Sequence, residues 1–192
     1  MQCWFARGAV PYFIAVFLSS FVQMGLFILF QRWLSFSFTG ASFFWRSMLL
    51  QFSLFVPCIF MVAPASFFSC RFPKGRVMAW SSFGMTLTLV AIAVLFGLDI
   101  GWVAFGLMLL FGIFLSIHSP AKLGILKELF GDEFLAKANA WQSFFAILGM
   151  VLVSFLTISI NPGEDSLLHY EILPYIFLGM SFLGTISSFF IH

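Results

Sequence analysis

The feature that most constrains this chain is a series of six apolar stretches, each about as long as a helix that crosses a membrane. A transmembrane helix needs about 20 predominantly apolar residues. Only 8% of the 192 residues are charged, whereas a soluble domain carries about 25%. A soluble enzyme, a disordered tail and a nucleic-acid binder are therefore excluded. The expected fold is a single all-α, polytopic membrane domain over residues 1–192, with spans at about 9–30, 44–69, 77–98, 102–119, 139–160 and 172–191.

The basic residues are distributed unevenly between the two sides of these spans. With a cytoplasmic N-terminus, the outer side holds only Arg32 and Arg46. The inner side holds Arg7, Arg71, Lys74, Arg76, Lys122, Lys127 and Lys137. Four acidic residues fall on the outer side: Asp99, Glu164, Asp165 and Glu171. Because cytoplasmic loops are enriched in Lys and Arg, the sequence predicts that both termini are cytoplasmic.

The third and fourth spans meet near residue 99, almost at the midpoint of the chain. Two groups of three helices are what an inverted 3+3 repeat would produce. This expectation rests on spacing alone. A six-helix channel or a rhomboid-like protease would also show six spans.

Polar residues are concentrated in two loops on the predicted inner side. Residues 69–77 form a short basic loop that contains Arg71, Lys74 and Arg76. Residues 120–138 form a longer connector. At its start, Ser119 and Pro120 are typical of the N-cap and the first residue of a short helix. The apolar residues of this connector fall on one face, which predicts an amphipathic helix at the membrane interface that ends at Gly131.

The connector also resembles a known family. The runs SPAKLGILKEL at 119–129 and LAKANA at 135–140 resemble the loop after the fourth helix and the start of the fifth helix in the lysophospholipid transporters of the major facilitator superfamily. The run RFPKGRV at 71–77 is similar to that family's loop between helices two and three. The matched connector residues are Ser119, Pro120, Lys122, Gly124, Glu128, Lys137 and Asn139.

The resemblance implies a fold, an activity and a location. It implies six helices that correspond to the N-terminal half of a twelve-helix transporter, which moves lysophospholipid, such as lysophosphatidylethanolamine, across a bacterial inner membrane by alternating access. Arg71, Lys74 and Arg76 would belong to the cytoplasmic gate. Cys70 stands where the superfamily usually has an Asp that takes part in this gate. Because the chain ends at His192, a second six-helix half or a homodimer partner is expected, and some family members are fused to an acyltransferase.

Two alternatives remain open at this point. The first alternative to a lysophospholipid transporter is a transporter of another small amphipathic substrate in the same superfamily. The second is a truncated fragment that does not transport. Within the spans, Gln23, Gln51 and Gln142 are candidates for substrate contact, although interhelical hydrogen bonding explains each of them better. His118 fits an interface residue better than a proton relay, since no carboxylate accompanies it inside the spans.

No catalytic or metal-binding pattern is present in the sequence. The three cysteines, Cys3, Cys58 and Cys70, are widely spaced, and no His ladder accompanies them. Neither a disulfide framework nor a zinc site is expected. Adjacent Asp132 and Glu133 point to different faces, which does not suit a paired acid and base. The sequence therefore predicts a protein that is not an enzyme and that uses no metal or cofactor, with the bilayer and a lipid or amphipathic substrate as partners.

Overall fold

The described part of the chain consists of helices joined by short turns, and it contains no strand. The computed structural model describes residues 8–98, 100–159 and 167–191. The helices are α1 (Ala9–Ser37), α2 (Gly40–Arg71), α3 (Lys74–Gly97), α4 (Gly101–Ser159) and α5 (Leu167–Phe189). All five contain segments long and apolar enough to cross a membrane. These helices confirm the prediction of a helical membrane protein, whereas the 3+3 repeat stays a prediction.

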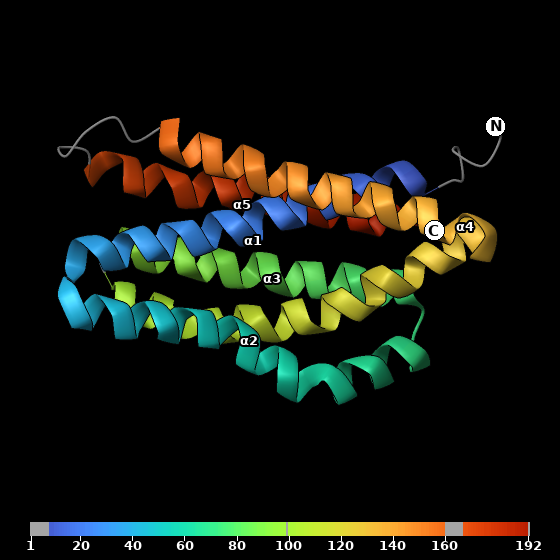
Figure 1. The fold of residues 1–192 in the computed structure, drawn as a ribbon, viewed down its shortest axis with the longest axis horizontal. Helices are drawn as coiled ribbons and strands as arrows, with labels where there is room; N and C mark the ends of the chain where they lie inside the picture. The colour runs from blue at the N-terminus through green and yellow to red at the C-terminus, as the bar shows by residue number, and fades with distance from the viewer. Residues whose placement is uncertain (1–7, 99, 160–166, 192) are drawn as a thin grey trace.

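Helix α4 bends back on itself at Gly131. Its 59 residues contain one non-helical residue, Gly131, with φ 69° and ψ 175°. Only glycine adopts a positive φ without a steric penalty. The bend divides α4 into a first arm (101–130) and a second arm (132–159), which run in opposite directions in Figure 1. The six predicted spans thus correspond to α1, α2, α3, the two arms of α4, and α5.

The predicted helix start at Ser119 and Pro120 is wrong. Pro120 lies inside the first arm of α4, which runs without interruption from Gly101 to the bend. Proline in a helix interior removes one backbone hydrogen bond. Here the helix continues because its next turns are packed against the bundle: Ala121 and Leu126 are fully buried. The first half of the predicted connector is therefore an extension of the fourth span, and the predicted break at Gly131 agrees with the structure.

Other sequence expectations fall outside the described residues. These are the turn at 161–163 and the positions of Arg7 and of three predicted outer acids, Asp99, Glu164 and Asp165. The helices are also longer than the predicted spans. Helix α1 extends to Ser37, where the first span was expected to end near residue 30, and α2 begins at Gly40, where the second span was expected to begin near residue 44.

Helix α1 lies at the centre of the bundle, between α4 and α5, and α2 lies at its edge. Six hydrophobic residues of α1 are completely buried, and they are Tyr12, Val16, Leu26, Leu29, Phe30 and Leu34. Helix α2 packs mainly against α4, and Figure 1 shows its second half diverging from the other helices. Pro57 and Pro64 both lie in this second half of α2. Proline is the commonest cause of such a bend.

One end of the bundle gathers most of the described basic residues, and we call it the basic end. The start of α1, the α2–α3 connection, the bend at Gly131 and the end of α5 all lie at this end in Figure 1. By their positions in these elements, Arg71, Lys74, Arg76, Lys122, Lys127 and Lys137 belong to it, whereas Arg32 and Arg46 lie toward the opposite end.

Close packing between α1 and the second arm of α4 depends on Gly149. A methyl group at Gly149 would lie 2.6 Å from the Phe17 carbonyl oxygen. We expect Gly149→Ala to lower the free energy of unfolding by about 1–3 kcal/mol, because backbone atoms cannot move aside as a flexible side chain can. Gly106→Ala is the matched control, since nothing lies within 4 Å of its added methyl group. It should leave stability unchanged or raise it. Unfolding in a detergent–denaturant titration measures both, and equal effects would contradict the packing.

Candidate functional site

An ion pair joins the two predicted loop motifs at the basic end. Lys74, the first residue of α3, places its Nζ 2.7 Å from Glu128 Oε1 in the first arm of α4. The two side chains are 30% and 57% exposed. Exposed ion pairs contribute about 0–1 kcal/mol to stability. The pair therefore adds little to the stability of the fold, and its main effect is to fix the first arm of α4 relative to the start of α3.

Gly124 makes room for the lysine of this pair. A methyl group at Gly124 would lie 2.6 Å from Lys74 Cδ and 3.0 Å from its Cε. The aliphatic part of Lys74 thus lies directly on the Gly124 backbone, and the ammonium group reaches Glu128 one turn further along. Three residues of the two motifs, Lys74, Gly124 and Glu128, are brought together although they are far apart in sequence.

The remaining motif residues are less closely associated. Arg71 is exposed, and its guanidinium carbon lies 5.8 Å from the Phe67 ring centroid. Ser119, Lys137 and Asn139 are exposed and make no side-chain interaction within the described residues. Gly124 and Glu128 thus contact α3, whereas Pro120 and Lys122 are half-buried within the first arm of α4.

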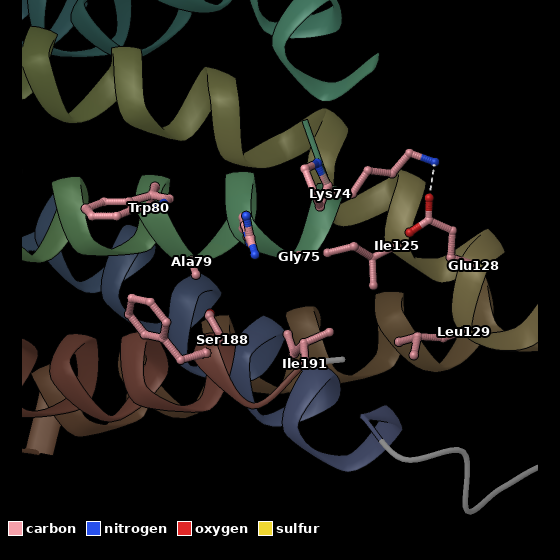
Figure 2. A pocket seen from close by; sticks show the side chains of 12 residues that line it. Lys74, Gly75, Ala79, Trp80, Ile125, Glu128, Leu129, Ser188 and Ile191 are labelled. Carbon is pink, nitrogen blue, oxygen red and sulfur yellow. Dashed lines mark ion pairs between the residues drawn. The ribbon is translucent and has the colours of Figure 1, made fainter. Parts of the chain in front are cut away.

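A cavity of about 730 Å³ lies beside the ion pair. It is bounded by the first turns of α3, the first arm of α4 and the end of α5, as Figure 2 shows. Its polar and charged side chains are Lys74, Arg76, Glu128 and Ser188, and its largest apolar side chains are Trp80 and Phe189. Within the described residues no carboxylate lies within 4 Å of Arg76. The cavity thus combines an unneutralised guanidinium group with an aromatic wall.

Tyr12 connects α1 to both arms of α4. Its hydroxyl lies 3.1 Å from the Lys122 carbonyl oxygen in the first arm and 2.5 Å from Gln142 Oε1 in the second arm. The Tyr12 side chain is fully buried. Lys122 itself is half-buried. Gln142, a candidate for substrate contact, is therefore occupied in holding the bundle together.

The other two candidate glutamines lie elsewhere. Gln23 is half-buried on α1, eleven residues beyond Tyr12, which corresponds to about 16 Å of helix. Gln51 is exposed on α2. Neither makes a side-chain hydrogen bond within the described part of the chain. The three glutamines do not form one cluster, so substrate contact at Gln23 and Gln51 stays a prediction.

Sequence reasoning missed a network of hydroxyl groups between α3 and α5. Ser82 Oγ lies 3.3 Å from Ser188 Oγ and 3.4 Å from His118 Nδ1. Thr86 Oγ1 lies 2.7 Å from Ser181 Oγ and 2.8 Å from Thr185 Oγ1. The available signal was the spacing of these residues, since 82 and 86, and 181, 185 and 188, fall on single helix faces. His118 is buried and belongs to this interhelical network.

Neither metal ligation nor sequence similarity adds a function to this geometry. Within the residues that the structure describes, no group of three His, Cys, Asp or Glu side chains could hold a metal ion. No family model, curated protein or solved structure matches the chain.

We expect Tyr12→Phe to lower the free energy of unfolding by about 1 kcal/mol, because the two arms of α4 lose the hydroxyl that lies within hydrogen-bond distance of half-buried acceptors on each. Tyr175→Phe is the matched control. Tyr175 is 57% exposed, and its hydroxyl makes no hydrogen bond within the described residues. Detergent–denaturant unfolding of the two variants provides the comparison. An equal loss in both would show that the Tyr12 hydroxyl does not connect the arms.

Reversing one charge of the Lys74–Glu128 pair should loosen the first arm of α4, and reversing both should restore it. We expect Lys74→Glu or Glu128→Lys to increase local opening by about two- to fivefold, which corresponds to the strength of an exposed pair. Amide hydrogen exchange over residues 74–80 and 120–130 measures this opening. The control is reversal of Lys127 and Asp132, which lie 2.9 Å apart within α4. If the double variant exchanged as fast as either single variant, the pair would not hold these elements together.

Proposed function

We propose that this protein is a membrane transporter that moves lysophospholipid, such as lysophosphatidylethanolamine, by alternating access, with the described bundle forming one half of the transport unit. The observation that carries the proposal is the contact of Lys74 with Gly124 and Glu128. The two motifs that resemble the lysophospholipid transporters lie in different loops, and their residues meet at one end of the bundle. A contact between two separately matched motifs is stronger support than either match alone.

The distribution of charge supports an assignment of sides. We propose that the basic end is cytoplasmic, because positively charged residues are retained on that side of a membrane. Arg71, Lys74 and Arg76 then belong to a gate on the cytoplasmic side of a bacterial inner membrane. Cys70, which is exposed immediately before Arg71, provides no carboxylate to this gate. Glu128 instead supplies the negative charge that Lys74 binds.

The exposed face of α2 supports a partner bundle. Of the five helices, α2 is the least covered, and Gln51 is exposed on it among Met48, Leu49, Phe52 and Phe55. An amide without a hydrogen-bond partner is costly in hydrocarbon. Contact with a second six-helix bundle, or with the aqueous cleft between two bundles, would remove this cost. We therefore place the transport pathway beside α2, with a second half or a second copy of the chain opposite.

Uptake of labelled lysophospholipid tests the transport proposal. Cells or vesicles that contain the chain, with and without a complementary six-helix half, should accumulate labelled lysophosphatidylethanolamine faster than empty membranes. Glu128→Lys should reduce this rate, and the double charge reversal at 74 and 128 should restore it, because the gate contact is rebuilt. The control is the reversal of the two charges of the Lys127–Asp132 pair, which alters the charge pattern of the connector without touching Lys74 or Glu128 and should leave the uptake rate unchanged.

The outcomes separate the alternatives. Uptake no faster than in empty membranes, in the presence of the complementary half, would overturn the proposal and favour a non-transporting fragment. Uptake of another amphipathic compound in place of lysophospholipid would retain alternating access and replace the substrate. If an acyltransferase acts with the protein, the lysophospholipid that enters should be recovered as diacyl lipid.

A further inference from the structure

The basic-end cavity has a net positive charge. Its charged side chains are Lys74, Arg76 and Glu128, and Glu128 is neutralised by Lys74 at 2.7 Å. The Arg76 guanidinium is exposed and has no carboxylate within 4 Å among the described residues. A planar guanidinium group can bind two phosphate oxygens at once. The cavity is therefore suited to an anion with a phosphate group.

The aromatic wall of the cavity indicates where this anion comes from. Trp80 lies one helical turn beyond Arg76, about 6 Å further into the membrane span. Residues four apart share a helix face, and both side chains line the cavity. Trp80 is 65% exposed and Phe189 is 50% exposed. Tryptophan is enriched at the level of lipid headgroups. In a bilayer, this arrangement would place a cation at headgroup depth and aromatic surface next to the start of the acyl chains.

We propose that this cavity binds an anionic phospholipid of the adjacent leaflet, with Arg76 holding the headgroup phosphate and Trp80 and Phe189 contacting the glycerol and upper acyl carbons. The volume of about 730 Å³ is within the range of small-molecule sites, about 300–1,000 Å³. Ser188 lies in the cavity wall, where its hydroxyl is hydrogen-bonded within the protein. The bound lipid is distinct from the transported one, since the cavity lies between α3, α4 and α5 and not beside α2.

Binding of phosphatidylglycerol to the purified full chain in neutral detergent tests the inference. Native mass spectrometry gives the apparent Kd from the fraction of chain with bound lipid. We expect Arg76→Gln to weaken this Kd about tenfold, as loss of a charge-assisted contact predicts. Lys127→Gln is the matched control. It removes a charge of the same sign from the same end of the bundle, and Lys127 does not line the cavity. Arg76→Lys, which keeps the charge without the planar fork, should give an intermediate Kd.

Three results would overturn the inference. The first is an Arg76→Gln Kd within about threefold of the Lys127→Gln value, which is well short of the tenfold loss expected for a charge-assisted contact. The second is equal binding of phosphatidylcholine, which would show that net negative charge is not selected. The third is displacement of the lipid by equimolar glycerol phosphate, which would identify a site for a soluble phosphate. Because the measurement is made at equilibrium without transport, its failure leaves the proposed transport function untouched, and the reverse also holds.

Discussion

The reversal of direction at Gly131 is the constraint on which the rest of the structure depends. In hydrocarbon, backbone groups must be satisfied within helices, so a chain that leaves a membrane must return as another helix. A single residue with φ 69° accomplishes this return. It brings the second arm of α4 alongside α1, where Gly149 allows the two backbones to approach closely. Tyr12 can then reach Lys122 on one arm and Gln142 on the other. Without the bend, α1 would have no neighbour on that side.

The helices themselves were predictable because the bilayer leaves few alternatives. A run of about 20 apolar residues must be helical in lipid, and a glycine after an amphipathic stretch indicates a break. The start of a helix at Ser119 and Pro120 was not predicted correctly, because local capping patterns do not reveal that Ala121 and Leu126 are buried on the same continuous arm. Tertiary packing here outweighs the one backbone hydrogen bond that proline removes.

The site was predictable only as a list of residues. Charge and motif identified Lys74, Gly124 and Glu128, yet no local rule places a lysine side chain on the backbone of a distant glycine. Tyr12 gave no signal at all, because one tyrosine in an apolar run is compatible with any depth or face. The hydroxyl residues of α3 and α5 carried a signal in their spacing, but serine and threonine also occur in spans where they bond only to their own backbone, as Ser19 does with the Val16 carbonyl oxygen. Only the packed structure distinguishes these cases.

Lys74 links the ion pair to the neighbouring cavity, since its side chain both binds Glu128 and lines that cavity. An anion held by Arg76 would attract the same ammonium group and compete with Glu128 for it. Coupling of this kind is reciprocal: if a headgroup in the cavity weakens the ion pair, then separation of the pair strengthens headgroup binding by the same factor. The exposed pair contributes at most about 1 kcal/mol, so a comparable interaction with a lipid phosphate is sufficient to change its population. The composition of the adjacent leaflet would then bias the position of the first arm of α4 without any change in the transmembrane packing around α1.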